Sequence, residues 1–172
     1  MPNVKSFPKT PHAFSTRNDL PAATRRKMIA LLDQQLADSF DLYSQVKHAH
    51  WNVKGPNFIA LHKLFDKLAD VVAEQSDKIA ERATAFGGVV HGSVRMAAAA
   101  SRLPEYPADA FAGELAVAAL ADRFAALGSS TRQAIEAAEK AEDMTTSDLF
   151  TQVSHDLDKA LWFLEAHLED GK

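Results

Sequence analysis

Apolar side chains recur at helical spacing in four long stretches of the chain, and helix-breaking or helix-starting residues bound each stretch. The turn Gly55-Pro56-Asn57 separates the first two stretches, and Gly87-Gly88 ends the second. A capping box, Thr145-Thr146-Ser147-Asp148, opens the last stretch. We therefore predict four long helices, over residues 21–53, 58–86, 110–141 and 145–168.

The connections between these helices indicate how they are arranged. A short turn makes the first two helices antiparallel neighbours, whereas about twenty residues separate the second helix from the third. That connection is long enough to cross the bundle, and it can hold a short helix over residues 95–101. With almost no strand signal, the pattern predicts an all-α protein with a ferritin-like four-helix bundle. The bundle domain spans residues 21–170, behind a flexible basic arm of residues 1–20.

Composition and charge narrow the chemistry. The 172 residues include no cysteine, so disulfides and thiolate metal sites are excluded, and any metal must bind nitrogen or oxygen ligands. No apolar run reaches the roughly 20 residues of a membrane span, and the N-terminus lacks the apolar stretch of a signal peptide, so we expect a cytoplasmic protein. The net charge of −4 divides into +5 over residues 1–27 (six basic, one acidic) and −9 over the rest (13 basic, 22 acidic). A basic end on an acidic body suggests two different tasks.

The second helix has two faces with different residue types. At about 100° per residue, one arc of about 80° forms the predicted core stripe. Its members are Leu61, Phe65, Leu68, Val72, Gln75 and Ile79. A second arc, about 100° wide, carries four residues of types that bind metals: His62, Asp66, Asp77 and Glu81. Alanines lie beside this arc at positions 69, 73 and 80. A solvated polar face is the common explanation for such an arc, but the i,i+4 spacing within each pair also suits metal ligands.

The height of these residues along the bundle restricts how they can meet. His50, near the end of the first helix, lies at nearly the same height as His62, because both are a few residues from the turn at Gly55. The second ligand pair, Asp77 and Glu81, is centred about 22 Å farther along the helix. Either the chain carries two half-built sites, or two chains pack their second helices antiparallel about a two-fold axis near residues 71–72 and complete two identical sites. The mixed ligands suit ferrous iron, and zinc or manganese is the alternative.

The residues around these positions resemble the signature of the Dps family, the DNA-binding proteins from starved cells. The resemblance covers nearly the whole chain and is carried by residues 47–58 (KHAHWNVKGPNF), 61–66 (LHKLFD), 77–82 (DKIAER) and 156–165 (DLDKALWFLE). It implies a dodecameric shell, built on two-fold dimers, that oxidises ferrous iron and stores ferric mineral. Hydrogen peroxide is often the preferred oxidant in this family, and several members bind DNA without sequence preference, which implies an association with the nucleoid.

The same resemblance assigns residues to these tasks. It implies that the protein is an oxidoreductase acting on metal ions. Its catalytic residues, which are also the iron ligands, would be His50, His62, Asp66, Asp77 and Glu81. The residues near an acidic pore would be Glu142, Asp143 and Asp148. Because the body is acidic, we expect DNA contacts from the arm residues Lys5, Lys9 and Arg17. Trp51 would lie beside the iron or pack at a dimer seam, whereas we expect His48 to point away from His50 and Trp162 to lie in the core.

Two other functions compete with this interpretation. Classical ferritins and bacterioferritins build a di-iron site inside one bundle from Glu-x-x-His motifs, and the sequence contains none. The second rival is an architectural DNA-binding shell with little iron oxidation. The complete set of five ligands argues against it, and a measurement of iron uptake would separate the two.

Overall fold

The computed structural model describes residues 13–169, and residues 1–12 and 170–172 lie outside the description. Five helices follow one another along the chain: α1 (Ala22–Asn52), α2 (Phe58–Ala85), α3 (Val94–Ala100), α4 (Gly113–Glu139) and α5 (Met144–Glu165). Within residues 13–169, β pairing is limited to one isolated parallel bridge, between Lys54 and Ala112. The prediction of an all-α four-helix bundle with a short extra helix is confirmed.

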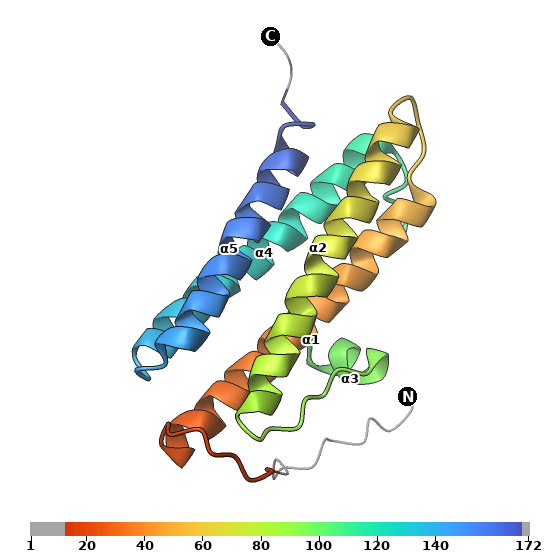
Figure 1. Cartoon of the computed structure of the whole chain (residues 1–172). Coiled ribbons are helices and arrows are strands. Elements are labelled where there is room, and N and C mark those ends of the chain that lie inside the picture. Colours follow the sequence, from red (N-terminus) through yellow and green to blue (C-terminus); the bar gives the residue numbers. More distant parts are fainter. Residues whose placement is uncertain (1–12, 170–172) are drawn as a thin grey trace.

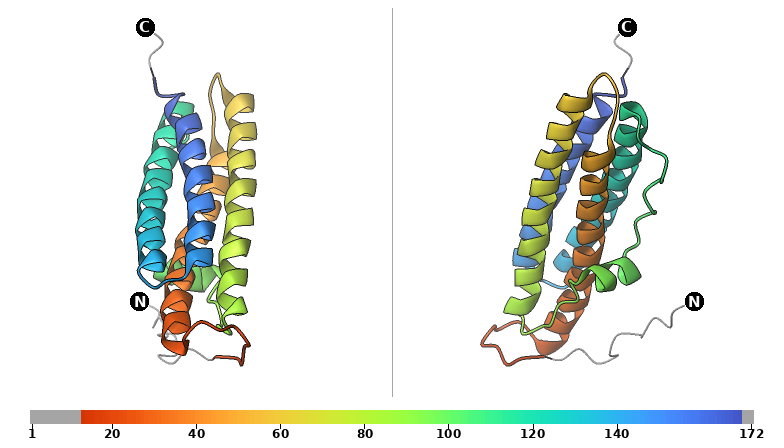
Figure 2. Two further views of the ribbon diagram at one scale, coloured as in Figure 1. Left: turned by 60° about the vertical axis from the view of Figure 1, so that its left-hand side comes forward. Right: turned by 90° about the vertical axis from the view of Figure 1, so that its right-hand side faces the viewer.

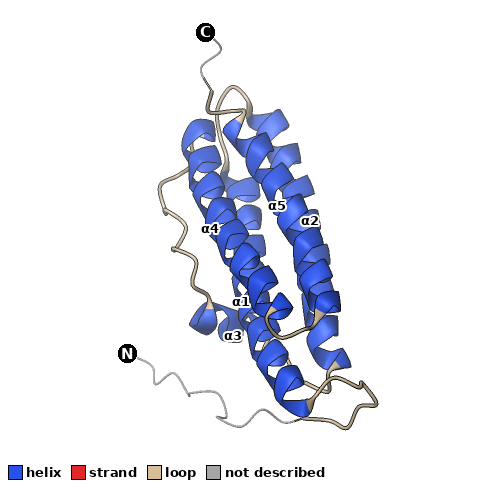
Figure 3. Cartoon of the chain, turned by 90° about the vertical axis from the view of Figure 1, so that its left-hand side faces the viewer, coloured by secondary structure: helices blue, strands red, loops and turns tan. Residues whose placement is uncertain are grey.

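Two helical hairpins lie side by side to form the bundle (Figure 1, Figure 2). α1 packs along α2, and α4 packs along α5. α2 ends at the end of the bundle where α1 begins, so the chain must return along the outside before α4 can start, and α3 lies in this crossover (Figure 3). Among residues 13–169, no helix is long and apolar enough to cross a membrane.

All four long helices contribute large apolar side chains to the core. The fully buried residues include Met28 and Leu42 of α1, Phe65 of α2, Phe124 of α4 and Phe150 of α5. The predicted core stripe of α2 is confirmed, because each of its six residues is at most 3 % exposed. This stripe orients α2, so its other face, with the candidate metal ligands, points away from the core.

One aromatic side chain departs from the predicted core. Trp162 is 62 % exposed on α5. The buried residues in this part of α5 are Ala160 and Leu164, and Trp162 lies about 200° around the helix from Ala160. The prediction of a core position for Trp162 is therefore wrong.

Two helices start at positions that differ from the sequence pattern. α4 begins later than predicted, because Phe111 and Gly113 pair with Lys54 in the turn before α2 and hold the preceding backbone extended. α5 begins directly after Asp143, whose side chain accepts a hydrogen bond from the Thr146 N–H as the N-cap. The predicted capping box two residues later is therefore wrong, and Thr146 lies inside the first turn.

The chain before α1 is held against the end of α2. The Phe14 N–H donates to the Gly87 carbonyl at 2.7 Å. Gly87 has a φ of +81°, and a Cβ there would clash with the Phe14 carbonyl, so this contact requires glycine. Arg25 then donates to the Asn18 carbonyl at 3.1 Å. The sequence predicts a flexible arm over residues 1–20, but the described part of it lies on the bundle.

Candidate metal centre

Two histidine side chains at the α1–α2 turn bond to each other's backbone. His50 comes from the last turn of α1, and His62 from the second turn of α2. Nδ1 of His50 lies 2.7 Å from the His62 carbonyl oxygen, and Nδ1 of His62 lies 2.9 Å from the His50 carbonyl oxygen. The two rings stack, with centroids 3.8 Å apart and planes inclined by 19°. The turn therefore holds both imidazoles in one arrangement.

This reciprocal pairing determines which nitrogens can bind a metal. A carbonyl oxygen only accepts hydrogen bonds, so each Nδ1 must carry the proton. In the neutral rings, each Nε2 then has a lone pair. Histidine ligands in metal sites commonly donate their other N–H to a backbone carbonyl in this way. His50 and His62 thus present two nitrogen donors beside the turn.

Asp66, one helical turn after His62, supplies a carboxylate to the same place. Its Oδ1 atom lies 3.7 Å from Nε2 of His50 and accepts a hydrogen bond of 2.7 Å from Nζ of Lys47. This bond from the Lys47 ammonium lowers the pKa of Asp66 below its ordinary value and raises the pKa of Lys47 above its own. The carboxylate therefore stays ionised, and because its side chain is about half exposed, a cation can reach it.

The other two candidate ligands lie farther along α2. Asp77 is eleven residues beyond Asp66, which is about 16 Å of helix, and Glu81 follows one turn later. Both side chains are exposed. Within residues 13–169 of one chain, no group of three His, Cys, Asp or Glu side chains could hold a metal ion by itself. The structure therefore brings the first three candidates near one another and leaves Asp77 and Glu81 apart from them.

A hollow of about 520 Å³ adjoins Asp77, between α1 and α2. Its wall is largely apolar, and the side chains that α2 contributes are small. The hollow is lined by Leu36, Phe40, Tyr43, Ala73, Ser76, Ala80, Val90 and Gly92. It lies on the face where the sequence predicts a contact with a second copy of α2.

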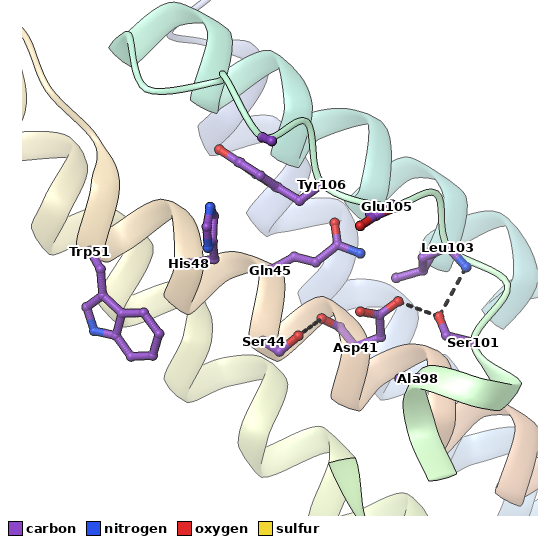
Figure 4. Close-up of a pocket in the computed structure, with 11 residues that line it drawn as sticks. Asp41, Ser44, Gln45, His48, Trp51, Ala98, Ser101, Leu103, Glu105 and Tyr106 are labelled. Carbon is purple, nitrogen blue, oxygen red and sulfur yellow. Dashed lines mark hydrogen bonds between the residues drawn. The ribbon is translucent and has the colours of Figure 1, made fainter. Parts of the chain in front are cut away.

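A second hollow, of about 670 Å³, lies where α1 faces the crossover (Figure 4). His48 and Tyr106 line it, with ring centroids 5.1 Å apart. Trp51 is at its edge, 64 % exposed, and Nζ of Lys47 lies 5.9 Å from the centroid of its ring. Trp51 therefore borders both this hollow and the ammonium group bound to the candidate ligand.

The three acidic residues considered for a pore have different surroundings. Asp143 is buried, caps α5 and accepts a hydrogen bond of 2.8 Å from Nη2 of Arg82, so its charge is neutralised inside the subunit. We therefore withdraw Asp143 as a pore residue. Glu142 and Asp148 are exposed, and Asp148 accepts a hydrogen bond of 2.9 Å from Gln152.

The residues considered for DNA contact are only partly described. Arg17 is exposed, and Lys5 and Lys9 lie outside the described residues.

Among functional residues, sequence reasoning missed Lys47, which bonds to a candidate ligand. Lys47 lies three residues before His50, and residues at this spacing are neighbours on one side of a helix. The sequence could therefore have indicated that Lys47 lies close to the candidate ligands.

Comparison with known proteins gives matches along nearly the whole chain. A model of the ferritin-like domain matches residues 29–172. The DNA protection during starvation protein of Agrobacterium fabrum (strain C58) is 41 % identical over 155 residues, which are 90 % of this chain and 96 % of that protein. The structure of DpsA14 from Streptomyces coelicolor has a TM-score of 0.87 and 32 % identity, and the match covers 94 % of this chain and 95 % of that chain.

The description of a third similar protein includes the type of metal site of its superfamily. The Dps protein from Vibrio cholerae O1, described as a member of a broad superfamily of ferritin-like diiron-carboxylate proteins, has a TM-score of 0.84 and 26 % identity. That match covers 91 % of this chain and 99 % of the other. Since the sequence and the fold both match over most of their length, the chain belongs to the Dps family of ferritin-like proteins.

Proposed function

We propose that this chain is a subunit of an iron-storing shell that oxidises ferrous iron at sites shared between two chains. The main support is the pair of Nε2 lone pairs held at the α1–α2 turn beside the Asp66 carboxylate. Two nitrogens and one carboxylate suit ferrous iron. Because they are only part of the ligand set, a second chain would complete the site with its Asp77 and Glu81.

The geometry of α2 supports an antiparallel contact between two copies. α2 is one continuous helix, so the centres of its two ligand pairs are about 22 Å apart. A two-fold axis near residues 71–72 would bring the histidine end of each helix to the acidic end of the other, and one contact would make two sites. The apolar hollow beside Asp77, with Ala73 and Ala80 in its wall, leaves room for a helix to approach closely.

Each side chain has a separate part in the proposed reaction. The neutral imidazoles bind the ferrous ion through Nε2, and the carboxylates offset its charge and that of the ferric product. Two ferrous ions give two electrons to one hydrogen peroxide, which takes up two protons and leaves as two waters. Both electrons reach the peroxide at one site, so no hydroxyl radical escapes to damage DNA. Oxygen is the second oxidant.

Exposed apolar surface supports contacts beyond the dimer, as the closed shell of twelve subunits implied by the resemblance to the Dps family would need. A two-fold contact alone ends at a dimer, so a shell requires a second contact. Ile59, Leu115 and Trp162 are each more than half exposed, and all lie toward the end of the bundle where α4 begins (Figure 1). Iron would pass Glu142 and Asp148 on its way in, because the acidic body attracts cations.

We also propose that the basic N-terminal end binds DNA without sequence preference. The acidic body repels phosphate, so the contacts must come from Lys5, Lys9 and Arg17. The name of the Agrobacterium relative, a DNA protection protein, agrees with this role. Twelve copies in one shell would add weak contacts through multivalency, and the shell would then associate with the nucleoid in the cytoplasm.

An architectural DNA-binding shell with little iron oxidation is the alternative. The reciprocal bonding of the two histidines favours oxidation, because a shell that only packs DNA has no use for two oriented nitrogen donors. The purified oligomer, given ferrous iron with peroxide or with air, should form ferric iron faster than buffer alone and should sediment faster as mineral accumulates. Oxidation at the rate of buffer alone would refute the proposed activity and leave the architectural role.

A further inference from the structure

The crossover before α4 is bonded to the turn that carries the two histidines. The Lys54 N–H donates to the Phe111 carbonyl at 2.8 Å, and the Lys54 carbonyl accepts from the Gly113 N–H at 3.1 Å. These bonds accompany the isolated bridge between Lys54 and Ala112. Both backbone groups of Lys54, four residues after His50, are thus bound to the crossover.

This bridge changes the partner of the His50 carbonyl. In a continuing helix, the Lys54 N–H would donate to the carbonyl of His50, four residues earlier. α1 ends at Asn52 instead, and the Lys54 N–H donates to Phe111. The His50 carbonyl accepts from Nδ1 of His62 at 2.9 Å. The bridge therefore holds the backbone directly beside the acceptor that selects the tautomer of His62.

Gly113 makes the close approach of the crossover possible. A Cβ at position 113 would lie 2.7 Å from Cδ1 of Leu61, a distance at which one of the two must move. Leu61 is 3 % exposed and directly precedes His62. Because the core around it is closely packed, a side chain at position 113 would push the crossover away from α2 next to a candidate ligand.

We infer that Gly113 is a positioning residue for the metal site. It lets the crossover reach Lys54, whose two backbone bonds hold the turn that carries the His50 carbonyl. That carbonyl holds the proton on Nδ1 of His62, so the ring presents Nε2 to a metal ion. The role in metal binding rests on the proposed function, whereas the tautomer of His62 is a property of the metal-free protein.

The experiment compares Gly113→Ala with Gly88→Ala as a matched control. Gly88 lies just beyond the other end of α2, and a Cβ there would lie 2.8 Å from Cγ2 of Ile29 and 2.9 Å from the Ala83 carbonyl oxygen, so this control crowds the core at least as much as Gly113→Ala does. In metal-free protein, nitrogen-15 NMR of the His62 ring should show the Nδ1–H tautomer in the wild type and in Gly88→Ala, and a mixture of tautomers in Gly113→Ala. Co²⁺ affinity, followed by visible absorbance, should fall about tenfold in Gly113→Ala alone.

A second change separates positioning from a general loss of packing. Leu61→Val removes Cδ1, the atom that an alanine at position 113 would meet. Added to Gly113→Ala, it should restore the wild-type tautomer of His62 and the Co²⁺ affinity. A folded Gly113→Ala protein with the wild-type tautomer and affinity would overturn the inference.

If Gly113→Ala does not fold, the metal-free wild type still tests the tautomer on which the inference depends. Nδ1–H on His62 supports the inference, and a ring protonated mainly at Nε2 in the metal-free wild type overturns it. An equal loss of the tautomer in Gly88→Ala would overturn it too, because the effect would then not be specific to position 113. The expected tautomers without any iron oxidation would refute the proposed function and not the positioning.

Discussion

A site shared between two chains makes a quantitative prediction about mixed dimers. Asp66→Asn and Glu81→Gln each remove one ligand from both sites of their own homodimer, so each variant alone should lose fast oxidation. In a mixed dimer, one site receives both defects, and the other combines the intact Asp66 of one chain with the intact Glu81 of its partner. Half of the sites in every mixed dimer should therefore be active.

The size of the recovery follows from α2. The two altered residues are fifteen positions apart on one continuous helix, or about 22 Å, so they cannot complete a site within one chain. When equal amounts of the two variants reassociate at random, half of the dimers are mixed. About one quarter of the wild-type rate should then return, as expected for isologous dimers.

The assay is stopped-flow oxidation of ferrous iron by peroxide, after the two variants have been dissociated and reassembled together. The control mixture combines Asp66→Asn with His62→Gln, which belong to the same half of the site, so every site in its mixed dimers keeps one defect. The control should show no recovery. If the Asp66→Asn and Glu81→Gln mixture also stayed inactive, or if an isolated monomer were fully active, the shared site would be refuted.

Four other predictions concern pH, stability, iron uptake and DNA. The affinity for ferrous iron, measured by calorimetry, should fall as the pH is lowered from about 7.5 to about 5.5, a range that includes the reference imidazole pKa of about 6.5. The reason is that a protonated imidazole has no lone pair with which to bind a metal. Equal affinity at both pH values would exclude histidine ligands. Asp143→Ala should lower the free energy of unfolding by about 3 kcal/mol or more in urea, because it leaves Arg82 without its buried partner, and an unchanged urea midpoint would contradict this. Neutralising Glu142 and Asp148 together should slow iron uptake by the shell and leave oxidation by dissociated dimers unchanged; equal uptake rates would remove the pore assignment. Deleting residues 2–12, upstream of the segment fixed on the bundle, should abolish a salt-sensitive DNA mobility shift and leave iron oxidation intact, and a shift that survives would exclude the deleted residues.

The helices that follow one local pattern could be predicted from the sequence, and the helix starts that depend on distant contacts could not. The core stripe of α2 follows directly from the 3.6-residue period. The start of α4 depends on Lys54, nearly sixty residues earlier, and the alanine-rich sequence around residue 110 is a good helix former in isolation. Asp143 and Thr145 are both suitable N-caps, and Asp143 prevails because its carboxylate also bonds to Arg82.

The candidate site also has features that the sequence predicts and features that it does not. The spacing of His62 and Asp66 and the turn after His50 are visible in the sequence, so three candidate ligands could be expected near one another. The reciprocal bonding of the rings and the place of Lys47 depend on side-chain rotamers, which spacing does not determine. Residues 161–164 are all apolar, so no period in the sequence distinguishes the exposed tryptophan from its buried neighbours.

The bond between Lys47 and Asp66 means that the protein brings its own cation to the carboxylate before iron arrives. In the proposed site, a ferrous ion that takes the place of the ammonium group at Oδ1 of Asp66 would raise the local charge by one unit and not by two. The ammonium stays attached to α1 through its side chain, and it can return when the ferric product leaves. On this proposal, each turnover at the carboxylate would exchange a tethered cation for a diffusing one, and Asp66 need never lack a positive partner.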